Sequence, residues 1–215
     1  MNLPHRHHRW LSALAIACLA SVAQARDAAP VAVETASVDA DLGRAMQAAQ
    51  AFSTRLRERL QAGIEAGGAA QAVAVCHSDA PRIATEVMRE HGVRLGRIAV
   101  PGRNRHPQQD ARDWPRAAIE RFQQAVDAGG AAAAQREVIR EGLPADVAVR
   151  LVRGIATEAA CLACHGTTLE PAVRAALARD YPADRATGFA VGDLRGALWV
   201  EVPVVPPPAP NGETR

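Results

Sequence analysis

Apolar residues recur every three or four positions between residues 42 and 64 of this 215-residue chain. The stripe consists of Leu42, Met46, Ala49, Phe52, Leu56, Leu60 and Ile64. This spacing gives an α-helix one apolar face, while Arg57 and Glu58 fall on its solvated side. Gly67-Gly68 follows the stripe and favours an end to the helix. The pattern therefore predicts a long N-terminal amphipathic helix that stops at this glycine pair.

A second helical pattern covers residues 69–90. Its apolar face consists of Val73, Cys76, Ala80, Ile83 and Val87. Pro81 interrupts the pattern, because proline lacks a backbone donor and disfavours the helical conformation of the residue before it. We expect either a kink at this point or a new helix capped by Ser78 or Asp79. In both cases Cys76 lies on the same side as aliphatic residues.

The downstream segments mix strand and helix patterns. Three segments have the apolar composition of strands, namely 94–100, 147–156 and 194–204. Two have helical spacing, one opened by Pro115 and ended by Gly129-Gly130, the other at 170–179. Because strands and helices do not alternate regularly, the pattern indicates an α+β fold with a small antiparallel sheet.

The two ends of the chain carry different signals. Residues 26–38 show no periodicity and are expected to form a disordered linker, and 206–215 read as a Pro-rich disordered tail. The expected folded unit is therefore 39–205, long enough for one domain with a sizeable core. With 25 basic and 23 acidic residues, the chain has no charge excess that would indicate a nucleic acid or an acidic membrane surface as partner.

Residues 1–25 have the features of a signal peptide. A basic start is followed by the apolar stretch 10–22 and by Ala23-Gln24-Ala25, so we expect cleavage after Ala25 and a periplasmic location. The apolar stretch is shorter than the roughly 20 residues that span a bilayer, and no later segment is long enough. Lipidation at Cys18 is the less favoured alternative, since its apolar stretch would be very short.

Cys161-Leu162-Ala163-Cys164-His165 is a C-x-x-C-H motif, the attachment site of a c-type haem. Cys161 and Cys164 would hold the haem covalently, and His165 would be the proximal iron ligand. Once the signal peptide is removed, Cys76 is the remaining cysteine, which is unusual in an oxidising compartment.

The sixth iron ligand is left open by the sequence. The candidates are Met46, Met88, Cys76, His77, His91 and His106. No methionine follows His165, which argues against the all-helical cytochrome c fold. Cys76 and His77 are adjacent, so on a helix they point about 100° apart and one of them at most faces the iron.

Several motifs recur in the order expected for a known family. They are Ala74-Val75-Cys76, Ala80-Pro81-Arg82-Ile83-Ala84, Arg103-Asn104, Cys161-Leu162-Ala163-Cys164-His165-Gly166, Ala186-Thr187-Gly188-Phe189 and Gly192-Asp193-Leu194-Arg195-Gly196-Ala197. Over 42–202 the chain resembles the small single-haem c-type proteins with a PAS-like α+β domain, long described as a domain of unknown function. The resemblance implies a PAS-like fold, Cys76 as distal ligand and His165 as proximal ligand.

The central loop departs from the family pattern. The family has arginine-asparagine-proline with a further asparagine and proline, whereas this chain has Arg103-Asn104-Arg105-His106-Pro107. Physically, Arg97, Arg103 and Arg105 are candidates to pair with haem propionates, because a guanidinium offers a fork of donors to a carboxylate. A solvated arginine-rich loop is the alternative.

Three functional classes follow from these residues. The first is an exported haem protein in redox or ligand sensing or in electron transfer, without enzyme activity, which needs a partner protein and could bind CO or NO. The second is a periplasmic haem enzyme of the peroxidase or nitrite-reductase type, with His77 or His91 as acid or base. The third is a disulfide or zinc protein without haem, in which Cys76, Cys161, Cys164 and His165 would bind the zinc.

Overall fold

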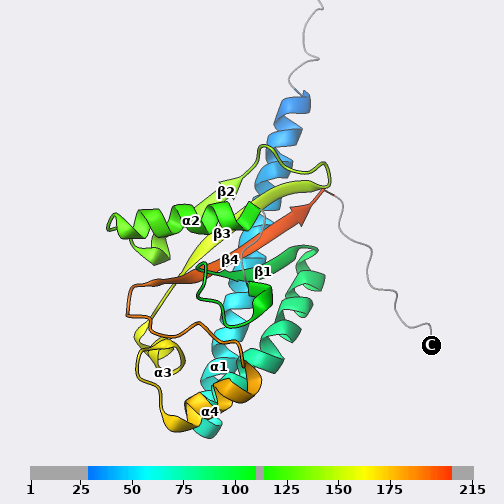
Figure 1. Ribbon diagram of the computed structural model, residues 1–215. Helices are drawn as coiled ribbons and strands as arrows, with labels where there is room; N and C mark the ends of the chain where they lie inside the picture. The colour runs from blue at the N-terminus through cyan, green and yellow to red at the C-terminus, as the bar shows by residue number, and fades with distance from the viewer. Residues whose placement is uncertain (1–28, 110–113, 205–215) are drawn as a thin grey trace, which may run out of the picture.

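The computed structural model describes residues 29–109 and 114–204 (Figure 1). The helices are α1 (Ala29–His91), α2 (Trp114–Asp127), α3 (Leu162–His165) and α4 (Pro171–Asp180). The strands are β1 (Arg94–Ala99), β2 (Arg136–Ile139), β3 (Val147–Ala156) and β4 (Leu194–Pro203). Short 3-10 turns are η1 (Pro107–Gln109), η2 (Ala132–Ala134) and η3 (Ala159–Cys161). The fold is thus α+β with a long N-terminal helix, as predicted.

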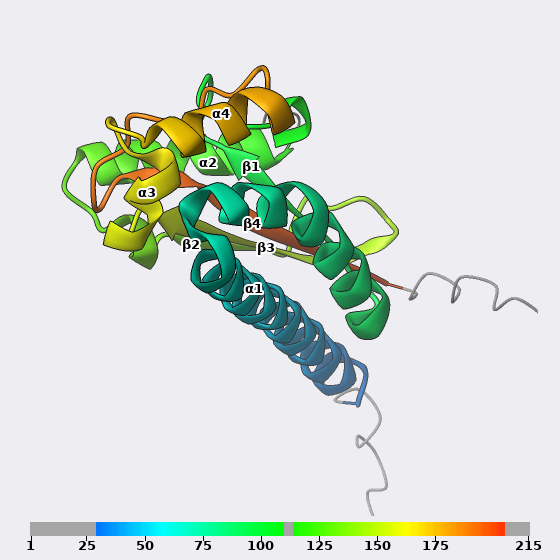
Figure 2. The same cartoon turned by 90° about the horizontal axis from the view of Figure 1, so that it is seen from below.

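Helix α1 folds back on itself at the predicted glycine pair. Gly68 has φ 71° and ψ −171°, a conformation that is essentially restricted to glycine. The break divides α1 into a first arm, 29–66, and a second arm, 69–91, which lie side by side in Figure 2. The arms approach closely near the turn, because a Cβ added to Gly63 would lie 2.9 Å from Cγ2 of Val75.

Pro81 does not divide the second arm. The break in helical backbone angles is at Gly67 and Gly68, and the helix continues through Pro81 to His91. Of the two alternatives at Pro81, a kink or a new helix capped by Ser78 or Asp79, the structure excludes the new helix. Proline at 81 removes the donor for the carbonyl of His77, but both residues are exposed, so water can satisfy that carbonyl.

The sheet has four antiparallel strands in the order β1-β4-β3-β2. Leu151 of β3 pairs with Val200 of β4, and Ile98 of β1 pairs with Ala197 of β4. The three predicted strands are present, whereas β2 was not predicted. The four residues of β2 are half-buried or exposed and include Arg136 and Glu137, so they give no apolar run.

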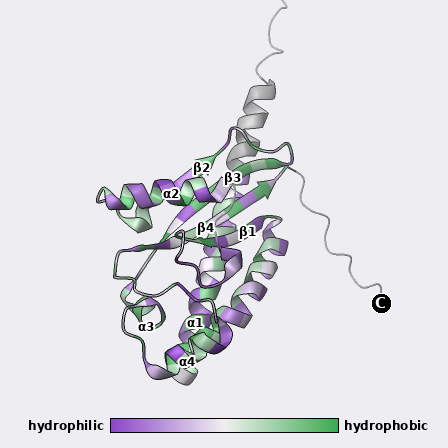
Figure 3. Ribbon diagram, viewed as in Figure 1, coloured by the Kyte–Doolittle hydropathy of each residue, from purple (hydrophilic) through white to green (hydrophobic). Residues whose placement is uncertain are grey.

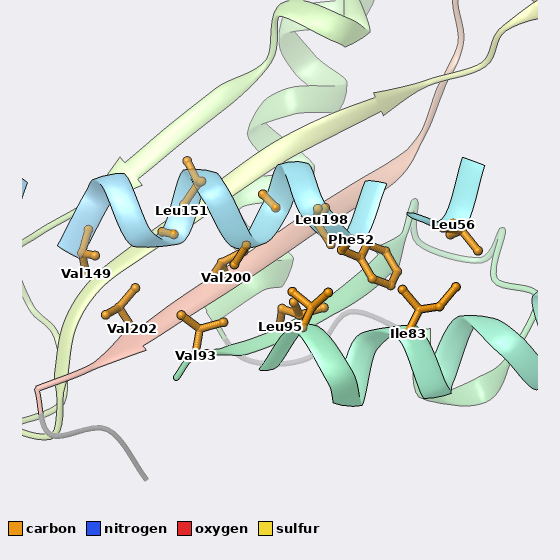
Figure 4. Packing of buried hydrophobic residues seen from close by; sticks show 14 of the residues in the cluster. Phe52, Leu56, Ile83, Val93, Leu95, Val149, Leu151, Leu198, Val200 and Val202 are labelled. Atoms are coloured by element: carbon orange, nitrogen blue, oxygen red, sulfur yellow. The ribbon is translucent and has the colours of Figure 1, made fainter. Parts of the chain in front are cut away.

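The arms of α1 cover one face of the sheet and α2 covers the other. The main cluster, between the arms and the sheet, is shown in Figure 4 and includes Phe52, Leu56, Ile83, Val93, Leu95, Val149, Leu151, Leu198, Val200 and Val202. On the other face, Ile119 and Phe122 of α2 pack against Val152 and Ala197. Hydrophobic and hydrophilic residues alternate around α2 in Figure 3, as expected for a helix with one buried side.

The structure describes part of the expected N-terminal linker, but neither the expected signal peptide nor the expected tail. The backbone of α1 begins at Ala29, so its first turns overlap the linker expected at 26–38. The expected signal peptide and tail lie outside the described residues. No helix within 29–109 and 114–204 is both long and apolar enough to cross a membrane.

Candidate functional site

The C-x-x-C-H motif lies at one end of the sheet, beyond the last residue of β3. Cys161 ends η3, and Cys164 and His165 belong to the single turn of α3. The backbone N–H of Glu158 points to Sγ of Cys161 at 3.4 Å, and the N–H of Gly166 donates to the carbonyl of Leu162 at 2.9 Å. Cys161, Cys164 and Cys76 are all free thiols. One short turn therefore presents two thiols and an imidazole together.

The imidazole of His165 is held in one tautomer by the loop before β4. Its Nδ1 lies 2.6 Å from the carbonyl oxygen of Ala186. A carbonyl can only accept, so Nδ1 carries the hydrogen and Nε2 keeps its lone pair. Burial, followed by the charges of Arg195 and Arg105, lowers the pKa of His165 to about 2. The ring is therefore neutral at physiological pH and offers Nε2 as a metal ligand.

Backbone hydrogen bonds attach the same loop to the motif. The N–H of Phe189 donates to the carbonyl of His165 at 2.9 Å, and the N–H of Gly188 donates to that of Gly166 at 3.0 Å. The Phe189 ring meets the His165 ring edge to face, with 6.2 Å between centroids. The 186–189 segment thus forms one wall of the site.

Cys76 reaches the site from the second arm of α1. It lies with Cys164 at the edge of a separate cluster, here called the site cluster, formed by Val73, Leu169, Val173, Ala176, Leu177 and Tyr181. Burial raises the pKa of the Cys164 thiol; the charge of Arg105 opposes this shift, and the neighbouring thiols of Cys76 and Cys161 add to it. The turn at Gly68 is what brings this arm against α4 and α3, as Figure 2 shows.

The other ligand candidates are placed differently. His77 is exposed and packs edge-on against Tyr181, with 5.4 Å between ring centroids, so Cys76 is the member of the pair that faces the motif. Met46 is 43% exposed and contacts Arg136 of β2, while Met88 packs against the main cluster. Nδ1 of His106 accepts from the backbone N–H of Gln108 within its own loop. His91 is the last residue of α1.

Arg103 and Arg105 have protein partners in this structure. Arg103 donates to the carbonyl of Thr187 at 2.8 Å, and its guanidinium stacks 3.5 Å from the centroid of Phe189. Arg105 is 6% exposed, makes a two-pronged ion pair with Asp184, and donates to the carbonyl of Cys164 at 2.7 Å. Both arginines tie the loops around the motif together, and their pairing with propionates stays a prediction.

Arg195 is a site residue for which the sequence assigns no role. Its Nη1 lies 3.4 Å from Nε2 of His165, and its Nε is buried without a partner among the described residues. Its position results from a bulge: Ile155 pairs with Gly196 and Ala156 with Leu194, so β4 advances two residues while β3 advances one. Bulges re-aim side chains and are common beside functional sites. The placement of Arg195 depends on the register between β3 and β4, which no local sequence motif predicts.

The donor set does not form a metal site of the zinc type. Within the ranges that the structure describes, no group of three or more Cys, His, Asp and Glu side chains is gathered closely enough to hold a metal ion. The neutral imidazole of His165 and the free thiols of Cys161 and Cys164 are the donors that a c-type haem requires.

The fold and the motif together define an α+β protein with a c-type haem attachment sequence. The family model described as Tll0287-like matches residues 24–203, so this chain belongs to the Tll0287-like family, which confirms the family resemblance. Among solved structures, the cyanobacterial heme-protein Tll0287 matches with a TM-score of 0.51 and 23% identity, over 73% of this chain and 92% of that one. This likeness shows the shared fold. No curated protein matches.

Proposed function

We propose that this protein is an exported c-type haem protein with a single haem and Cys/His iron ligation. Cys161 and Cys164 form the thioether links, His165 is the proximal ligand and Cys76 is the distal one. The observation that carries the proposal is the tautomer of His165: its Nε2 keeps a lone pair, which here faces Nη1 of Arg195 at 3.4 Å, on the turn that presents the two thiols. The heme-protein Tll0287, which shares the fold, supports it.

The proposed role is redox or ligand sensing or electron transfer, without catalysis. Bound haem supplies a one-electron couple and, when the sixth position opens, a site for CO or NO. The thiolate of Cys76 donates charge and favours ferric over ferrous iron, so the reduction potential falls below that of a Met/His pair. With haem bound, reduction would weaken the iron–thiolate bond, and release of Cys76 would then serve as a sensing step. Either role requires a partner protein, and the leader-like sequence at 1–25 supports the periplasm as the location.

The ligand assignment is tested by electron paramagnetic resonance (EPR) and absorption spectra of protein matured with haem c. Cys76→Ala should retain covalent haem, because Cys161 and Cys164 hold it, but should lose the low-spin thiolate signal. His77→Ala is the matched control, since its exposed side chain should leave the spectrum unchanged. A Cys76→Ala spectrum identical to wild type would refute the distal assignment.

The absence of catalysis is tested by turnover with hydrogen peroxide and with nitrite. Wild-type protein should show no more turnover than a haem peptide with the same axial ligands. Faster turnover that is lost in His77→Ala or His91→Ala would favour the enzyme alternative, in which one of these histidines transfers protons.

A further inference from the structure

Two arginines from neighbouring strands lie beside the motif without a carboxylate partner. Arg195 is on β4 and Arg97 is on β1, and these two strands are hydrogen-bonded to each other. Among the described residues, the one polar contact of the Arg195 side chain is with Nε2 of His165. The Arg97 guanidinium makes a cation–π contact with the Phe52 ring, 5.8 Å from the ring centroid. In contrast, Arg105 in the same region has Asp184.

Two buried side-chain polar atoms without partners belong to residues beside the bulge. Among the described residues they are Nε of Arg195 and Oγ1 of Thr157. Thr157 is 1% exposed and follows β3 directly, and its backbone N–H donates to the carbonyl of Asp193, just before β4. Buried polar groups are normally hydrogen-bonded, so two such atoms on either side of one bulge indicate a polar group that binds there.

The positive charges of Arg195 and Arg97 indicate that the polar group bound beside the bulge is an anion. The Nε of Arg195 is buried without a partner among the described residues, and neither Arg195 nor Arg97 has a carboxylate within ion-pair distance there. A buried cation is costly unless it is paired, and a second cation beside it adds repulsion. An anion with carboxylate geometry satisfies both side chains, since each guanidinium donates a fork of hydrogen bonds to two oxygens.

We propose that Arg195 and Arg97 bind the propionate carboxylates of the haem, and that Arg103 and Arg105 act as structural residues that position the surrounding loops. This inference rests on the proposed haem function. Two propionates carry two negative charges, which match the two arginines that lack a carboxylate partner among the described residues. The bulge in β4 then serves the site by directing Arg195 toward His165 and the haem.

The test compares resonance Raman spectra and redox titrations of haem-loaded protein. Arg195→Gln and Arg97→Gln should each shift the propionate bending mode and lower the midpoint potential, because loss of a positive charge disfavours the added electron. Arg195→Lys should retain more of the wild-type potential than Arg195→Gln. Arg153→Gln, an exposed arginine of β3, is the matched control and should change neither readout.

Unchanged Raman modes and potentials in both Gln variants would overturn the proposal. So would shifts in Arg103→Gln or Arg105→Gln that exceed those of Arg195→Gln. If Arg195→Gln does not fold, Arg97→Gln and Arg195→Lys decide the question, since they remove or reshape one cation at a time. A wild-type protein without a haem c absorption spectrum would instead refute the proposed function itself.

Discussion

The two ends of the sheet are held together by different interactions. The main cluster is built from aliphatic and aromatic side chains that α1 and the sheet bury against each other. The motif end has the smaller site cluster, and its loops depend on arginine contacts to carbonyls and to Asp184. Apolar packing needs no further component, whereas the motif end keeps unpartnered polar atoms. The first region is therefore complete as apolar packing, whereas the second retains polar groups for a ligand, which we propose is haem.

The largest test of this contrast is removal of the haem. The double variant Cys161→Ala/Cys164→Ala should lose amide hydrogen-exchange protection in α3, α4 and 181–193, while β3 and β4 keep theirs, because a ligand stabilises the segments that it contacts. Exchange measured by mass spectrometry reports each segment. Cys76→Ala, which keeps the covalent links, is the control. An equal loss of protection along the whole chain would contradict the contrast.

Arg105→Leu should destabilise the motif end by about 3–5 kcal/mol, because it leaves the Asp184 carboxylate buried and unpaired. The side chain of Asp184 is 9% exposed. Urea unfolding gives the free energy. Adding Asp184→Asn should recover part of the loss, since the amide keeps an acceptor for the N–H of Ala186. No difference between the single and double variants would show that the ion pair is unimportant.

Leu151→Ala should cost about 2–5 kcal/mol, because it leaves a cavity in a fully buried position of the main cluster. The EPR spectrum of the folded fraction should stay as in wild type, since Leu151 lies in the other region. Val191→Ala removes apolar carbons from a side chain that is 61% exposed and should change the unfolding free energy by less than about 0.5 kcal/mol. A changed iron spectrum in Leu151→Ala would show that the regions are coupled.

Gly68→Ala should destabilise the reversal of α1 by about 1–3 kcal/mol, since alanine does not tolerate the backbone angles at this position. Gly43→Ala is a matched control with the opposite sign. Gly43 lies within a helix with nothing within 4 Å of an added Cβ, so alanine should stabilise by about 0.5–1 kcal/mol. Thermal unfolding distinguishes the two. Equal effects would mean that the turn is not specific to glycine.

Arg59→Gln should have the smallest effect, at about 0.2–1 kcal/mol. Arg59 pairs with Asp79 across the two arms at 2.6 Å, but its side chain is 50% exposed. High salt should remove the difference from wild type, because exposed charges are screened. A larger loss that persists in high salt would assign the ion pair a structural role like that of Arg105.

The sequence predicts the parts of this molecule that depend on local pattern. Periodicity locates both arms of α1 and three strands, and helical geometry separates Cys76 from His77. The alternative of a new helix at Pro81 fails, because the effect of a proline depends on whether water can reach the carbonyl that loses its donor, here that of His77. The structural contacts of Arg105 and the placement of Arg195 also escape prediction. They arise from a loop contact across 79 residues of chain and from a shift in strand register.

The position of β4 has a consequence for the order in which the protein assembles. β4 follows every other described element along the chain, yet it lies between β1 and β3 in the sheet. During synthesis, β1 has no strand to pair with until β4 arrives, so sheet closure is a late and non-local event. The C-x-x-C-H turn precedes β4, and it therefore emerges while the domain is still open. If haem is attached to Cys161 and Cys164 as proposed, the attaching enzymes meet these thiols before the fold encloses them.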